Sequence, residues 1–88
     1  MMKKEAYDRF MSKMSSEFGN VDGVKEFLLD AEELAKYGEK RVALENLLEN
    51  LLENEIYISS ELINLAEEAF SDNPTDYDNE LIYDIKQF

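Results

Sequence analysis

The sequence contains no histidine, no cysteine and no tryptophan, and it has only one proline and three glycines among its 88 residues. Without histidine and cysteine, the chain lacks the commonest general base, the thiolate nucleophile and most zinc ligands. Disulfide bonds are excluded for the same reason. Glycine-rich phosphate loops and the G-x-S-x-G motif of hydrolases are also missing. We therefore predict that the protein is not an enzyme and has no catalytic, cofactor-binding or metal-binding residues.

Basic residues are scarce, and most of them lie in the first half of the chain. The net charge is −12. Residues 1–38 carry eight acidic and six basic side chains, whereas residues 39–88 carry thirteen and three. Between Val42 and Ile85 there are twelve acidic residues and no Lys or Arg. A field of this sign repels nucleic acid and anionic membranes and attracts basic proteins, so we expect a basic protein partner.

Long apolar runs are missing as well. No stretch approaches the 18 residues or more that a membrane span requires, and the first ten residues lack the apolar core of a secretory signal. Together with the absence of cysteine, these features predict a cytoplasmic protein. Eighty-eight residues are enough for one small domain with a modest core, so we expect a single domain over residues 1–88.

Apolar residues recur at helical spacing along most of the chain and predict an all-α fold, a compact bundle of four to five short helices. The expected helices cover residues 3–18, 23–37, 40–54, 60–70 and, as a short fifth helix, 80–88. The last segment also admits a strand, but a strand there would have no evident partner. Residues 71–79 hold the only proline and many turn formers, which predicts a loop.

Five residues provide signals for the expected helix ends. Asp22 and Ser59 are predicted to cap the amino ends of the second and fourth helices, because their side-chain oxygens can accept hydrogen bonds from free backbone N–H groups. Ile58 and Ile63 flank Ser59 at the spacing of a hydrophobic staple. Gly38 follows the second helix, where a glycine in the left-handed conformation commonly ends a helix.

The stretch from Arg41 to Ser59 repeats Leu-Glu-Asn-Leu every four residues. On a helix the leucines form one arc, which we interpret as core. The three glutamates Glu45, Glu49 and Glu53 fall on one flank and the asparagines on the other. Like charges four residues apart destabilise a helix by about 0.2–0.5 kcal/mol per pair. Since the glutamates bring no local benefit, we expect them to serve a contact outside the chain.

Further candidates for that contact lie in the predicted loop, where Tyr77 stands among acidic residues as a possible interface anchor. The complete set of candidate contact residues is Glu45, Glu49, Glu53, Asp72, Asp76, Tyr77 and Asp78. The sequence leaves open whether the glutamate flank and the loop share one face. The loop aspartates also suggest a calcium site. However, an EF-hand loop counted from Asp72 or from Asp76 would not have the glycine and the final glutamate that such a loop requires.

Several short segments between Gly38 and Ala69 carry a resemblance to a known family. They are Gly38-Glu39, Val42-Ala43-Leu44-Glu45-Asn46-Leu47, Leu51-Leu52-Glu53-Asn54, Ile56, Ile58-Ser59 and the amphipathic helix from Glu61. In these segments the chain resembles the MafI-type immunity proteins, which are small bacterial antidotes encoded beside polymorphic or contact-dependent toxins. It departs from the family at Lys40-Arg41, where neutral or proline-containing residues are common, and near Tyr57, where the family often has proline.

The resemblance implies a helical protein that binds and neutralises one cognate toxin domain, often a nuclease. Charge supplies a matching mechanism, because an acidic face can cover the basic substrate-binding surface of a nuclease and exclude its substrate. Two alternatives belong to other classes. One is an acidic nucleic-acid mimic or adaptor that binds a basic DNA-binding protein. The other is a carboxylate metal enzyme or calcium binder.

Overall fold

The computed structural model describes residues 2–87, and within this range it contains five α-helices and no strand. The helices are α1 (Lys4–Phe18), α2 (Val24–Lys36), α3 (Lys40–Glu53), α4 (Ser60–Phe70) and α5 (Asp76–Gln87). The prediction of an all-α bundle of four to five helices is therefore confirmed. None of these helices is long and apolar enough to cross a membrane.

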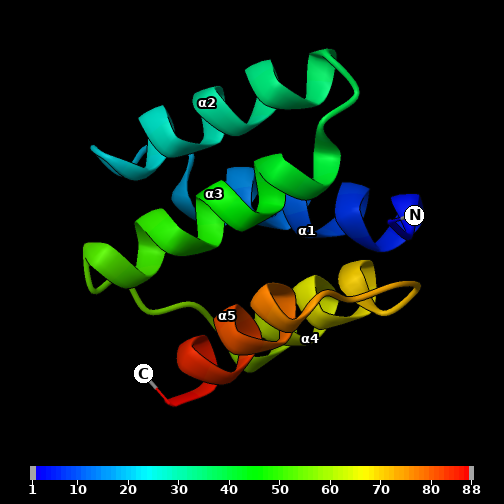
Figure 1. The fold of residues 1–88 in the computed structure, drawn as a ribbon. Helices are drawn as coiled ribbons and strands as arrows, with labels where there is room; N and C mark the ends of the chain where they lie inside the picture. The colour runs from blue at the N-terminus through cyan, green and yellow to red at the C-terminus, as the bar shows by residue number, and fades with distance from the viewer. Residues whose placement is uncertain (1, 88) are drawn as a thin grey trace.

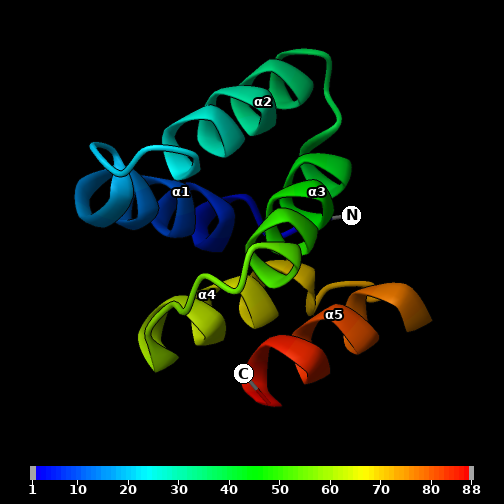
Figure 2. The ribbon, with the colours of Figure 1, turned by 90° about the vertical axis from the view of Figure 1, so that its left-hand side faces the viewer.

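Helix α3 runs through the middle of the bundle (Figure 1). Helix α2 packs along one side of it and runs in the opposite direction, as the short connection through Gly38 requires. On the other side α3 contacts α5, which also packs against α4, while α1 lies mainly against α4 (Figure 2). The glutamate-bearing helix is thus the neighbour of α5, although residues 54–75 separate the two helices in sequence.

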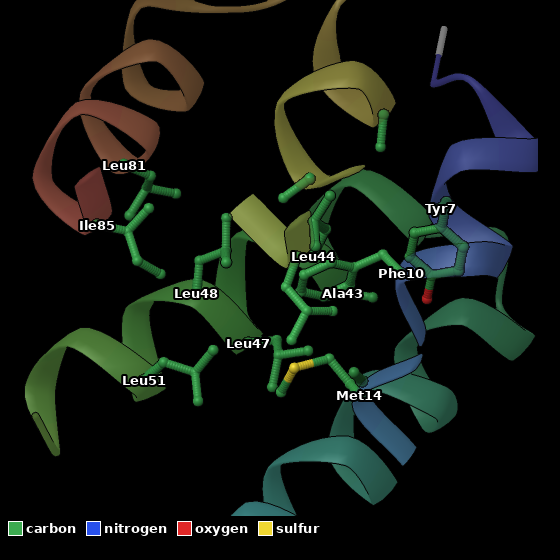
Figure 3. Packing of buried hydrophobic residues seen from close by; sticks show 14 of the residues in the cluster. Tyr7, Phe10, Met14, Ala43, Leu44, Leu47, Leu48, Leu51, Leu81 and Ile85 are labelled. Carbon is green, nitrogen blue, oxygen red and sulfur yellow. The ribbon is translucent and has the colours of Figure 1, made fainter. Parts of the chain in front are cut away.

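The leucine arc of α3 forms the centre of the core, as predicted. Leu44, Leu47, Leu48 and Leu51 have no exposed surface. Side chains of α1 and α5 close around them from either side (Figure 3). Burying one leucine side chain is worth about 1.5–3 kcal/mol, so this arc is what holds α3 in position. The glutamate flank of α3 is fixed by the same packing.

Two of the predicted helix ends are confirmed. The Ser59 hydroxyl accepts a hydrogen bond from the Leu62 N–H at 3.2 Å and caps α4. Gly38 has a φ of 78° after α2. Around it, the N–H groups of residues 38 and 39 donate to the carbonyls of Ala35 and Leu34, the two bonds of a Schellman end.

The prediction of Asp22 as the cap of α2 is wrong. Gly23, with a φ of 89°, occupies that position, and no side chain caps this helix. The chain passes through the left-handed conformation at Gly23, where glycine is tolerated without steric cost. The helix therefore starts one residue later than predicted, and Asp22 lies too early to reach its first N–H groups.

The predicted loop over residues 71–79 is too long, because α5 already begins at Asp76. Thr75 is its cap: the Thr75 hydroxyl accepts from the Asp78 N–H, and the Asp78 carboxylate accepts from the Thr75 N–H, both at 3.0 Å. This reciprocal pair is a capping box with aspartate in the third helical position. The spacing Thr-x-x-Asp could have revealed it. The segment from Glu80 onward is helical rather than a strand, as far as residue 87.

Candidate functional site

The structure brings the glutamate flank of α3 and the first turn of α5 together on one face. Glu45 and Glu49 are half-buried at the contact between the two helices. The Tyr77 hydroxyl forms a hydrogen bond with the Glu49 carboxylate. Asp78, the next residue, shares a hydrogen bond with Glu45. The question that the sequence left open is thereby answered for these four residues.

Asp78 itself is not a surface residue. Its side chain has 0% exposed surface, so the prediction that it contacts a partner is wrong. Its Oδ2 atom accepts hydrogen bonds from the Arg41 guanidinium and from the Thr75 N–H. A buried carboxylate needs such partners, because desolvation would otherwise disfavour its charge strongly. The role of Asp78 is to fix the start of α5 against α3.

Arg41 is the functional residue that sequence reasoning missed. It is the last basic residue before the span from Val42 to Ile85, which contains no Lys or Arg. Its side chain is 25% exposed. Besides the ion pair with Asp78, it donates to the Asn73 carbonyl at 3.0 Å and lies over the Phe70 ring at 5.6 Å. A single guanidinium thus ties the start of α3 to the end of α4 and the start of α5.

The neighbouring carboxyl groups of Glu45 and Asp78 differ in their affinity for protons. Burial, followed by the hydrogen bond and negative charge of Asp78, raises the pKa of Glu45 to about 7, although Arg41 acts in the opposite direction. Burial alone would raise the pKa of Asp78 as well. The hydrogen bonds from Glu45 and Thr75 and the charge of Arg41 outweigh it, so this pKa is lowered. A proton that the pair binds therefore resides on Glu45 and not on Asp78.

Tyr77 is held in place by its neighbours while part of its ring stays accessible. Its side chain is 42% exposed. Partial desolvation, the hydrogen bond to Glu49 and the negative charges of Glu49, Glu45 and Glu80 raise the pKa of the phenol. The hydroxyl therefore stays protonated and remains a hydrogen-bond donor to Glu49 throughout the physiological range.

Glu80 and Asp84 extend this surface along α5. They follow Tyr77 at i+3 and i+7, which places all three on the same side of the helix. Glu80 is close enough to influence Tyr77 electrostatically. We call the resulting surface the acidic face, and it consists of Glu45, Glu49 and Glu53 of α3 with Tyr77, Glu80 and Asp84 of α5. The side chains of Glu53, Glu80 and Asp84 are exposed to solvent.

The remaining two predicted residues are exposed at the start of α5 and just before it. Asp72 is exposed in the turn after α4, and Asp76 is exposed at the first position of α5. Asp76 points about 100° away from Tyr77, but it precedes Glu80 by four residues and therefore lies on the same side of α5 as Glu80. Asp76 thus borders the acidic face at the amino end of α5, whereas Asp72 lies before this helix.

Basic side chains form ion pairs with only a few of the acidic residues in 39–88. Of the thirteen acidic residues in 39–88, three form ion pairs within residues 2–87, which leaves ten without one. The three pairs are Arg41–Asp78, Lys86–Glu67 and Lys13–Glu61. Lys40 is also engaged, since its ammonium lies 5.5 Å from the centre of the Tyr7 ring. Every exposed carboxylate of the acidic face belongs to the unpaired group.

Other surface features are less distinctive. A groove between α1 and α4 is lined by side chains of both signs, among them Arg9, Lys13, Glu17 and Glu61. Within residues 2–87 no group of three or more carboxylates is arranged to hold a metal ion. In contrast to these features, the acidic face combines unpaired charge of a single sign with a positioned aromatic side chain.

Comparisons of the chain with protein-family models, with curated proteins and with solved structures find no match. The resemblance to the MafI-type immunity proteins stays a prediction, and the case for a functional surface rests on the geometry and charge described above.

Proposed function

We propose that this protein is an immunity protein that binds and neutralises a cognate bacterial toxin, a basic nuclease, in the cytoplasm of the cell that makes it. The observation that carries the proposal is the acidic face, where five carboxyl side chains surround one half-exposed tyrosine. Charge of one sign focused on one face favours a partner with the opposite charge.

The two helices provide complementary parts of such an interface. Exposed carboxylates at Glu53, Glu80 and Asp84 accelerate encounter with a cationic surface over distances up to about one Debye length, roughly 8 Å at physiological salt. Tyr77 provides an aromatic anchor at the centre. Because Glu49 already fixes its hydroxyl, the ring loses less conformational freedom on binding than a free tyrosine would.

The dimensions of the face suit a surface that binds nucleic acid. Glu45 and Glu53 are eight residues apart on α3, which corresponds to about 12 Å along the helix axis. Phosphates along one strand are spaced about 3.4 Å apart, so the glutamate flank covers a length of three to four phosphates. Basic side chains that hold a nucleic acid backbone could pair with these carboxylates instead, and the substrate would then be excluded.

Co-expression with the candidate toxin tests this proposal. The natural candidate is a compact basic carboxyl-terminal domain encoded by the neighbouring gene, expressed inducibly in a bacterial host. We expect the wild-type protein to restore growth and to stop nucleic acid degradation by the purified domain. The variant Glu53→Lys/Glu80→Lys/Asp84→Lys should bind at least about 100-fold more weakly, as expected when three attractive charges become repulsive.

The matched control is Asp22→Lys/Glu26→Lys/Asp30→Lys, which changes the net charge equally on exposed positions at the amino end of α2. It should protect almost as well as wild type. Equal protection by both triple variants would show that the acidic face is only a solvated surface. Equally tight binding of wild type to unrelated basic proteins such as histones would instead support the nucleic-acid mimic.

A further inference from the structure

The buried carboxylate of Asp78 has one oxygen with an unusual environment. Oδ2 accepts hydrogen bonds from Arg41 and Thr75, as described above. Oδ1 is buried and accepts no hydrogen bond from any N–H or hydroxyl group within residues 2–87. The remaining hydrogen-bonding neighbour of this side chain is the carboxyl group of Glu45. Two ionised carboxylates have no donor between them, so a hydrogen bond here requires a proton.

We propose that Glu45 and Asp78 bind one proton between them and that this proton acts as a pH-sensitive latch between α3 and the first turn of α5. With the proton present, Glu45 donates to Asp78 and the contact is closed. When the proton is lost, two negative charges face each other and only one guanidinium compensates them. The contact that positions Tyr77 then weakens.

The other groups around the pair do not replace the proton. From α3, Arg41 faces it as the one cation and Glu49 as a further anion. The α4–α5 connection contributes the N–H and the hydroxyl group of Thr75. It also contributes the Asn73 carbonyl, which accepts a hydrogen bond from Arg41. Helix α4 contributes the ring of Phe70, on which Arg41 lies. On α5, Tyr77 donates to Glu49, and Glu80 adds negative charge nearby.

The direction of the pH effect follows from the proton affinities. The pKa of Glu45 lies near 7 in the folded protein and near its ordinary value of 4.5 in the unfolded chain. A carboxyl group whose pKa is raised on folding contributes stability below the unfolded pKa, and this contribution is lost as the pH rises through the folded value. The latch should therefore be closed at pH 5 and weakened at pH 8. In that interval Asp78, whose pKa is lowered, stays ionised.

Carbon-detected NMR titration of the glutamate side-chain carboxyl groups tests the inference directly on the isolated protein. We expect the Glu45 carboxyl carbon to titrate with a midpoint near 7, well above the ordinary value of 4.5. In parallel, exchange of the Asp78 and Asn79 amide protons, corrected for intrinsic rates, should become about tenfold faster between pH 5 and pH 8. A Glu45 midpoint below about 5 would overturn the proposal.

The variant Glu45→Gln provides the second arm, because its side-chain amide can donate to Asp78 at any pH. In this variant the corrected exchange of these two amides should not change between pH 5 and pH 8. The matched control Glu53→Gln removes a carboxyl group from the same helix without touching the pair, so it should keep the wild-type dependence. If Glu45→Gln kept that dependence too, the latch would be refuted. Since no toxin is used, this outcome is independent of the proposed function.

Discussion

The guanidinium of Arg41 reaches three parts of the chain that are distant in sequence. It pairs with Asp78 in α5, donates to Asn73 in the α4–α5 connection and lies on the ring of Phe70 in α4. Lysine could provide the charge, but only the planar fork of arginine serves two acceptors at once while it stacks on a ring. Arg41 therefore positions the acidic face without being part of it.

Replacement of Arg41 should reveal this role. Arg41→Met keeps an apolar stem for Phe70 but leaves Asp78 as a buried, unpaired charge. We expect the free energy of unfolding to fall by about 3 kcal/mol, the typical cost of breaking a buried ion pair from one side. Arg41→Lys should lose less, because the charge remains. Urea unfolding monitored by circular dichroism measures both values, and a loss below about 1 kcal/mol for Arg41→Met would contradict this account.

At the scale of helices, the sequence was most informative where a local signal and the core pattern agree. Ser59 precedes an apolar stripe directly, so the start of α4 could be predicted to the residue. Thr75 begins a helix whose first turn is polar, and the aspartates around it resemble a loop. Only the long-range pairing of Arg41 with Asp78 shows that this turn is packed. Such pairings cannot be deduced from spacing alone, and without them the Thr-x-x-Asp spacing at the start of α5 does not stand out among the turn formers around it.

The end of α3 shows a local conflict of another kind. Glu55 has a φ of 53°, the left-handed conformation that glycine adopts without steric cost. The N–H of Ile56 donates to the Leu51 carbonyl at 2.9 Å, and the N–H of Glu55 donates to the Leu52 carbonyl at 3.2 Å. These bonds and the partly buried Ile56 hold the turn in place against the strain at Glu55.

Glycine at this position should relieve the strain. We expect Glu55→Gly to raise the free energy of unfolding by about 0.5–1 kcal/mol, since the relief of a left-handed side chain exceeds the entropy cost of glycine in the unfolded chain. The control is Glu55→Ala, which removes the same charge but keeps a Cβ atom, and it should not stabilise the protein. Thermal unfolding of the two variants separates backbone strain from charge. Equal stabilisation by both would assign the effect to charge instead.

At the scale of the whole molecule, the uneven charge could be read from the sequence, but its arrangement could not. The base-free span predicted an acidic surface, and the leucine period predicted which side of α3 is buried. Neither signal shows that α5 lies beside α3, that Asp78 turns inward, or that Glu80 and Asp84 complete the face. Those features depend on the way in which distant helices meet, and therefore on tertiary packing.

The concentrated charge should make the stability of the protein depend strongly on salt. The molecule measures 32 × 30 × 19 Å, so at 0.01 M ionic strength, where the Debye length is about 30 Å, all its charges repel one another almost unscreened. At 0.15 M the Debye length falls to about 8 Å and much of this repulsion disappears. Between these two conditions we expect sodium chloride to raise the free energy of unfolding in urea by about 1 kcal/mol.

The variant Glu53→Lys/Glu80→Lys/Asp84→Lys has a net charge of lower magnitude and should show a clearly smaller increase. If wild type were insensitive to salt, the carboxylates of the acidic face would not repel one another appreciably, and the electrostatic basis for its attraction to a cationic partner would be lost as well.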